Sequence, residues 1–188
     1  MKTVLTLLVL AILQSSCHQK LTNKKEITEF ISDTSNGLTI SHELDNDVKV
    51  SMVYVPQPLL KVPKLNSKKN AQCYFSFRIS RKHNQLLRQL SLDHYSKMVS
   101  VLSFRMQDYV AAIDSKNSEV RPTQSVYQQT FGLTNYDELM IVFDAKNILS
   151  SKNFKITVDE FGLGLGSLDF NFRSDDIITI NKIATEII

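Results

Sequence analysis

Alternating hydrophobic and polar positions predict β-strands over most of the chain. Residues 72–79 show the pattern most clearly, and alternation of this kind places every second side chain on one face of a sheet. Short apolar or alternating runs predict further strands at residues 38–44, 48–55, 102–113, 120–131, 139–143, 154–158, 168–172 and 177–180. Residues 27–31 fit either a short first strand or one helical turn.

A helical pattern follows Ser91. Leu92, Tyr95, Val99 and Leu102 recur at helical spacing, and Ser91 is a favourable residue for the helix start. Where this helix ends is ambiguous, because Leu102 and Met106 fit both a continued stripe and an alternating strand. We favour a helix over 91–100 and a strand over 102–113, since the turn at 114–118 would then join that strand to the next one.

The spacing of these elements predicts the fold class. Strands recur every 10 to 15 residues with turn signals between them, which is typical of antiparallel sheets rather than of alternating strands and helices. We therefore expect one mainly β domain over residues 27–188, an antiparallel β-sandwich that is immunoglobulin-like in the broad sense, with one short helix. An α+β fold is the alternative. Pro56, Pro58 and Pro63 predict an extended surface excursion over residues 56–70.

The amino-terminal 17 residues have the pattern of a secretory signal. Lys2 precedes an apolar run from Val4 to Leu13, and small or polar residues then lead to Cys17. The apolar run has ten residues, well short of the roughly 20 that cross a bilayer as a helix. We expect residues 1–16 to be a signal peptide and residues 17–26 to be a tether.

Leu13, Ser15, Ser16 and Cys17 resemble the processing site of bacterial lipoproteins, although Gln14 stands where that family usually has an aliphatic residue. The resemblance implies that Cys17 becomes the first mature residue, carries a diacylglyceryl group and a further acyl chain such as palmitate, and anchors the protein to the outer membrane. Two or three acyl chains give stable attachment. The alternative is a soluble secreted protein.

Charge is distributed unevenly along the chain. Twenty-two cations against nineteen acids leave too small an excess for a dedicated nucleic-acid binder. Residues 48–92 nevertheless contain nine cations and no acid, which indicates either a solvated surface or a face for an anionic glycan, a lipid or an acidic protein. The candidate ligand-binding residues are Lys61, Lys64, Lys68, Lys69, Arg78, Arg81 and Lys82.

No catalytic or metal-binding pattern stands out. The four histidines are scattered, Cys73 lies in an apolar strand and is expected to be a small buried residue, and Asp169 occupies the place of the second glycine of a nucleophile motif at Ser167. Gly162, Gly164 and Gly166 lack the spacing of a phosphate loop and predict a turn or bulge. No cofactor is indicated.

These observations rank three functions. The first is a non-enzymatic interaction or scaffold lipoprotein of the cell envelope that binds an envelope protein. The second is a module for an anionic ligand or a glycan that uses the basic region 56–88. The third is an envelope hydrolase whose site assembles from residues distant in sequence.

Overall fold

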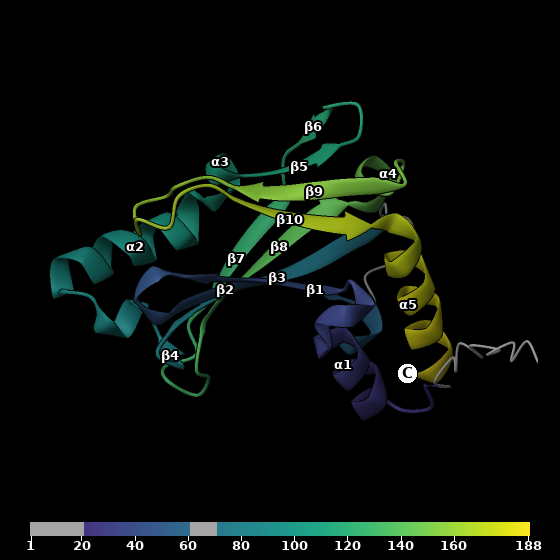
Figure 1. Ribbon diagram of the computed structural model, residues 1–188, viewed down its shortest axis with the longest axis horizontal. Helices are drawn as coiled ribbons and strands as arrows, with labels where there is room; N and C mark the ends of the chain where they lie inside the picture. Colours follow the sequence, from purple (N-terminus) through teal and green to yellow (C-terminus); the bar gives the residue numbers. More distant parts are fainter. Residues whose placement is uncertain (1–20, 61–70) are drawn as a thin grey trace, which may run out of the picture.

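The computed structural model describes residues 21–60 and 71–188. It is mostly β-structure, with two antiparallel sheets and helices at their ends (Figure 1). The strands are β1 Thr39–Leu44, β2 Val48–Val55, β3 Gln72–Arg81, β4 Asn84–Gln85, β5 Val110–Asp114, β6 Glu119–Val120, β7 Gln124–Gln128, β8 Asp137–Asp144, β9 Asn153–Val158 and β10 Leu168–Arg173. The α-helices are α1 Lys24–Ser32, α2 Leu92–Phe104, α3 Met106–Tyr109, α4 Ala145–Ile148 and α5 Ser174–Ile187.

Hairpins and one long-range pairing build the two sheets. The first sheet has the order β1-β2-β3-β8-β7, with β4 paired to β3, and the second has the order β10-β9-β5-β6. Strands β3 and β8 are separated by more than fifty residues and pair over eight positions, with Phe75 opposite Ile141. The chain passes from the second sheet to the first between β6 and β7. Strand β7 pairs only with β8 and forms the outer edge of the first sheet.

The apolar faces of the two sheets pack against each other. The ring of Phe75 on β3 lies 5.1 Å from that of Phe172 on β10, measured between centroids, and the ring of Phe77 lies 6.1 Å from that of Phe170. The Phe77–Phe170 pair is edge-to-face and the Phe75–Phe172 pair is tilted, and such ring contacts add to the free energy gained by burying the rings. At one side the edge strands β1 and β10 meet, and His42 Nε2 lies 2.9 Å from the carbonyl oxygen of Asp169.

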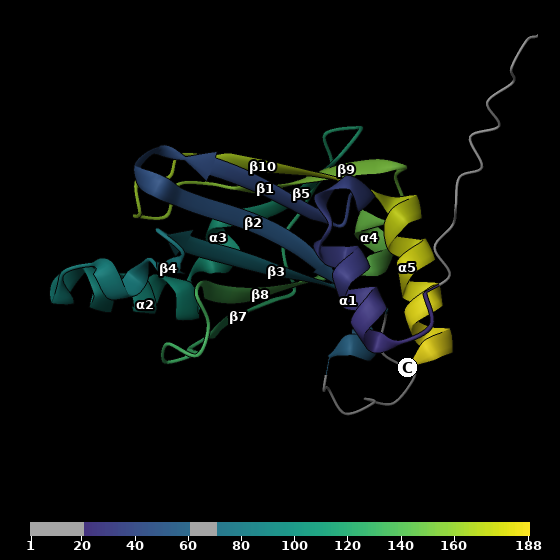
Figure 2. The ribbon, with the colours of Figure 1, turned by 60° about the horizontal axis from the view of Figure 1, so that its bottom comes forward.

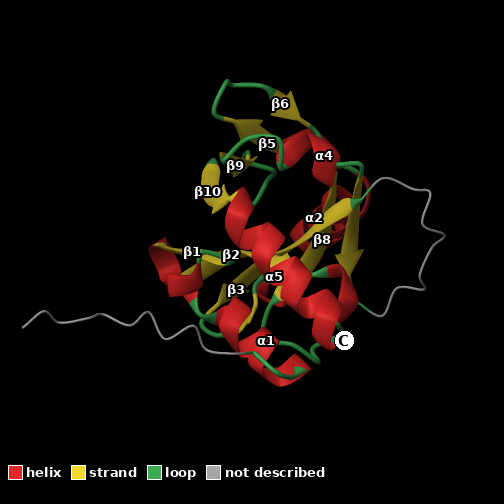
Figure 3. Ribbon diagram, turned by 90° about the vertical axis from the view of Figure 1, so that its right-hand side faces the viewer, coloured by secondary structure: helices red, strands yellow, loops and turns green. Residues whose placement is uncertain are grey.

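Helices close the two ends of the long axis. At one end α1 and α5 lie side by side (Figures 1 and 3), and α5 buries Ile177, Ile180 and Ala184. Helix α2 occupies the opposite end (Figures 1 and 2), where Ser91 caps it and Met98 and Leu102 are buried. Leu21, the first described residue, is buried in the apolar cluster together with Ile27 and Ile31 of α1.

Several sequence expectations are confirmed. The hairpin over 38–44 and 48–55 is β1 and β2, the clearest alternating stretch is β3, and the strands expected at 139–143, 154–158 and 168–172 are β8, β9 and β10. The turn after Asp114 joins β5 to the two-residue strand β6. Of the two readings of residues 27–31, the helical one holds, because α1 begins at Lys24 and ends at Ser32.

Four expectations are wrong. Residues 102–113 are not one strand. Leu102 belongs to α2 and Met106 to α3, both on the buried helical face, and the strand begins only at Val110. The strand over 177–180 is part of α5, and the single expected helix is five α-helices in the described residues. Helix α1 also begins within the segment read as a tether. The signal segment, Cys17 and most of the excursion over 56–70 lie outside the described residues.

Candidate functional site

The loop between β7 and β8, residues 129–136, exposes two large apolar side chains. Phe131 is 78 % exposed and Leu133 is 90 % exposed. The loop lies at the same end of the molecule as α2 (Figures 1 and 2). We call residues 129–136 the Phe131 loop.

The backbone of Phe131 is in the left-handed region, with φ 50°. This conformation costs about 1–2 kcal/mol for a residue with a Cβ atom, and it is rare for a bulky one. Gly132 follows with φ 87°, and a Cβ there would collide with the guanidinium of Arg88. The turn therefore requires glycine at 132 and holds Phe131 in a strained backbone conformation.

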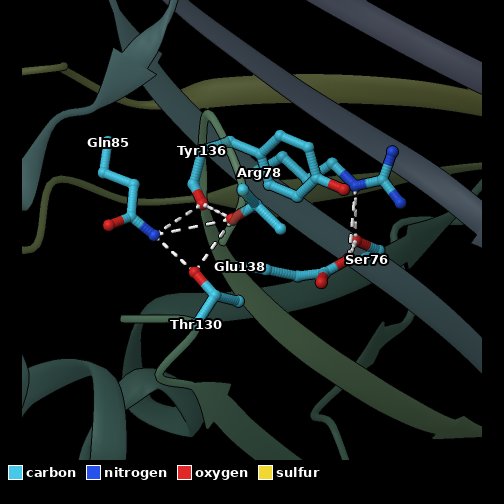
Figure 4. A network of polar contacts seen from close by, with 7 residues as sticks. Ser76, Arg78, Gln85, Thr130, Tyr136 and Glu138 are labelled. Carbon is cyan, nitrogen blue, oxygen red and sulfur yellow. Dashed lines mark hydrogen bonds and ion pairs between the residues drawn. The ribbon is translucent and has the colours of Figure 1, made fainter. Parts of the chain in front are cut away.

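Polar contacts with residues distant in sequence fix this turn (Figure 4). The side-chain amide of Gln85 donates to the hydroxyl of Thr130 and lies 3.3 Å from the carbonyl oxygen of Tyr136. The hydroxyl of Thr134 donates to the same carbonyl at 2.7 Å. Gln85 is buried, so these hydrogen bonds compensate for its removal from water. The loop is thereby held to β4 at both of its ends.

The next part of the network lies on the outer face of the first sheet. The guanidinium carbon of Arg78 lies 4.7 Å from the ring centroid of Tyr136, and its Nε lies 2.9 Å from the hydroxyl oxygen of Ser76 and 3.3 Å from Glu138. Ser76, fully buried, donates to the Glu138 carboxylate (Figure 4). The hydrogen bonds from Arg78 to Ser76 and Glu138 both use Nε.

Asp137 holds the chain beneath the loop. Its carboxylate accepts a hydrogen bond from the backbone N–H of Leu87 at 2.9 Å, and the Tyr127 hydroxyl lies 3.4 Å away. Burial raises the pKa of Asp137, and these donors offset only part of that effect. The group is oriented towards backbone N–H rather than into an open cleft, which indicates a structural role.

Further exposed apolar side chains lie on α2 and β7. Leu92 and Phe104 on α2 are 80 % and 83 % exposed, and Val126 on β7 is 42 % exposed. Helix α2 packs against β7, which leads directly into the Phe131 loop. We call Leu92, Phe104, Val126, Phe131 and Leu133 the apolar end.

The glycine-rich segment after β9 forms a carboxylate-binding turn. The carboxylate of Glu160 accepts hydrogen bonds from the backbone N–H groups of Gly162, Gly164 and Gly166, at 2.6, 2.8 and 2.8 Å. Partial burial opposes ionisation, but the N–H donors outweigh it and lower the pKa of Glu160. The expected turn is confirmed, and its backbone N–H groups bind a carboxylate of the same chain. His94 joins this turn to α2 through the carbonyl oxygen of Gly162, 2.9 Å from Nε2.

The predicted basic residues do not gather in one place among the described residues. Arg78 faces outward on β3, whereas Arg81 lies on the opposite side of the strand and Lys82 is in the turn to β4, with φ 50°. Lys61, Lys64, Lys68 and Lys69 lie outside the described residues. The sequence signal that could have led to the Phe131 loop is its neutrality, since residues 122–136 contain no charged side chain.

A shallow groove of about 400 Å³ lies on the second sheet, away from the Phe131 loop. Its polar lining includes Asn153, Lys155, Asn171 and Arg173. Lys155 is already paired with Asp169 at 2.6 Å, and Arg173 is paired with Asp176 at 2.7 Å. The groove therefore presents its charged side chains largely in ion pairs.

Within residues 21–60 and 71–188, no three His, Cys, Asp or Glu side chains come together in a way that could bind a metal ion. None of the helices in this part of the chain is long and apolar enough to span a membrane. No known protein family, curated protein or solved structure matches the chain.

Proposed function

We propose that this chain is a lipid-anchored interaction protein of the bacterial cell envelope that binds another envelope protein through the Phe131 loop, without chemistry of its own. The observation that supports it is the exposure of Phe131 and Leu133 in a strained turn that long-range hydrogen bonds hold in place. Strain of this kind persists only where the surrounding structure imposes it.

The energetics favour protein binding over simple solvation. Burying one large apolar side chain such as Phe131 at an interface contributes about 1.5–3 kcal/mol. Preorganisation adds to this, because a turn already fixed by Gln85 and Thr134 loses little conformational entropy on binding. Aromatic side chains in such positions are frequent binding hot spots.

The position of the loop agrees with attachment through Cys17. Leu21 lies beside α1, and the Phe131 loop lies at the opposite end of the long axis (Figures 1 and 2). An anchor just before Leu21 would therefore direct the apolar end away from the membrane surface. The two packed sheets support the finer proposal of a β-sandwich, immunoglobulin-like in the broad sense, whose connecting loops bind the partner.

Site-specific photo-crosslinking in intact cells tests the partner. A photoreactive amino acid at position 131 should give a protein adduct of one discrete mass, and the same amino acid at the exposed position 178 on α5 should not give it. The adduct should disappear when Leu133 is changed to Ser. Equal adducts from positions 131 and 178 would contradict the proposal.

The mass of the membrane-extracted protein tests the anchor. We expect a chain that starts at residue 17 and is heavier by two or three acyl chains, and a Cys17→Ser variant that lacks this mass. An unmodified mature chain would instead support the soluble secreted alternative.

Arg78 supports a second candidate, a site for an anionic glycan. Its guanidinium is stacked on Tyr136 and held through Nε. The planar donors of a guanidinium match the geometry of a carboxylate or sulfate group. Binding of polygalacturonate should weaken with salt and with Arg78→Gln, and it should be unchanged by Lys182→Gln on α5. Equal binding by the two variants would exclude this site.

A further inference from the structure

Strand β7 is a terminal strand of the first sheet, with no further strand paired to it in the described part of the chain. It pairs with β8 along one side, and no backbone hydrogen bond joins its five residues to any other described segment. Figure 2 shows it as the lowest strand of the first sheet, with no strand beyond it. Alternate N–H and C=O groups of an edge strand point away from the sheet and can pair with another strand.

Strand β7 differs from the edge strands β1, β6 and β10 in having no charged side chain. The edge strand β1 carries Glu43, paired with Lys49; β6 carries Glu119, paired with Arg121; and β10 carries Arg173, paired with Asp176. Charged side chains on edges prevent unwanted strand pairing. The sequence of β7 is Gln-Ser-Val-Tyr-Gln, and Val126 at its centre is 42 % exposed. The usual protection by charged side chains is therefore missing along β7.

The composition of β7 favours a second copy of the same chain as its partner. In antiparallel pairing about a two-fold axis, residues whose numbers sum to the same value face each other. With Val126 at the axis, Gln124 faces Gln128 of the partner subunit, and Val126 faces Val126 of the partner subunit. Ser125 faces Tyr127 of the partner subunit, so no two charged side chains are opposed anywhere along the paired strands.

We propose that β7 pairs antiparallel with β7 of a second copy, so that the first sheets of the two subunits form one continuous sheet across a two-fold axis at Val126. This inference does not depend on the proposed function. The Phe131 loop begins just beyond the paired residues, so each subunit retains a loop of its own.

Disulfide trapping tests the register directly. The test uses the full chain carrying Cys17→Ser in a mild detergent. In this chain, Val126→Cys places a thiol on each of two directly opposed residues. Their Cα atoms then lie within the 4.4–6.8 Å separation that a disulfide needs. Mild oxidation should then give a covalent dimer. Gln124→Cys is the matched control, because residue 124 and its symmetry mate are about four residues, or 13 Å, apart. The buried thiol of Cys73 is common to both variants.

Light scattering tests the interface without a crosslink. The chain with Cys17→Ser should have twice its monomer mass, and Val126→Lys should halve that mass by opposing two cations at the axis. Ile178→Lys, a similar change at an exposed isoleucine on α5, should leave the dimer intact. A monomer at the highest soluble concentration, a dimer that survives Val126→Lys, or equal crosslinking at 126 and 124 would each overturn the proposal. Crosslinking at Phe131 to a different protein would be unaffected.

Discussion

The carboxylate of Glu160 accepts the backbone N–H of Gly162 at 2.6 Å, two residues further along the chain, and the turn that follows closes around the same carboxylate. His94 of α2 contacts this turn at the carbonyl oxygen of Gly162, and the side chain of Met98 occupies the space that a Cβ at Gly162 would need. The glycines at 162, 164 and 166 all have positive φ, so their backbones can direct N–H groups towards one point. A carboxylate thus organises the loop that packs beneath α2.

Glu160→Gln should destabilise the protein at neutral pH and have less effect in acid. A carboxyl group whose pKa is lower in the folded state stabilises the protein at pH values above its unfolded-state pKa. This stabilisation is lost as the pH falls through the folded-state pKa. Urea unfolding at several pH values between 7 and 3 should show the two proteins converging towards low pH. Glu186→Gln, an exposed change on α5, is the control. A pH-independent difference would contradict this account.

Asp137 should show the opposite dependence on pH. Burial raises the pKa of Asp137 in the folded state. The protein therefore loses stability as the pH rises from the unfolded-state pKa of this group to its folded-state pKa. Asp137→Asn removes this dependence and keeps an oxygen for the N–H of Leu87. Asp137→Ala leaves that N–H without an acceptor and should cost about 1–3 kcal/mol. Urea unfolding of both variants at neutral pH should show that Asp137→Ala is less stable than Asp137→Asn. Equal free energies of unfolding would show that the hydrogen bond from Leu87 is unimportant.

Phe75 and Phe104 form a matched pair for testing how the sheets pack. Phe75 is fully buried among the rings of both sheets, whereas Phe104 is 83 % exposed. Phe75→Ala should lower the free energy of unfolding by about 3–5 kcal/mol, because it leaves a cavity. Phe104→Ala should change it by less than about 0.5 kcal/mol. A large loss for Phe104→Ala would mean that its side chain is covered in solution.

Strand alternation was readable from the sequence wherever one face of a sheet is buried. Phe75 and Phe77 lie on the face of β3 that packs against the second sheet, and the polar residues that alternate with them lie on the opposite face. Alternation misled at residues 102–106, since Phe104 belongs to a helix and faces solvent. At 177–180 the isoleucines suggested a strand, but Ile177, Ile180 and Ala184 form a helical stripe that becomes visible only when the full length of α5 is considered.

The Phe131 loop could not be located from the sequence, because its geometry depends on distant partners. Gln85 lies 45 residues before Thr130, and no local pattern joins them. The glycine-rich turn was recognisable as a turn, but the role of Glu160 depends on backbone directions that only the folded chain defines. The neutral stretch over 122–136 was the available clue, and its meaning required knowledge that β7 lies at an edge.

Cys73 should be unreactive in the folded protein. It is 1 % exposed on β3, and burial raises the pKa of its thiol to about 12. At pH 8 about one thiol in ten thousand would be ionised, and the thiolate is the species that alkylating reagents attack. In the Cys17→Ser chain, iodoacetamide should therefore label Cys73 only after urea is added, whereas a cysteine introduced by Val126→Cys should react without it. The mass of the protein after timed quenching measures both rates, and rapid stoichiometric labelling of native Cys73 would show that the first sheet opens far more readily than its packing implies.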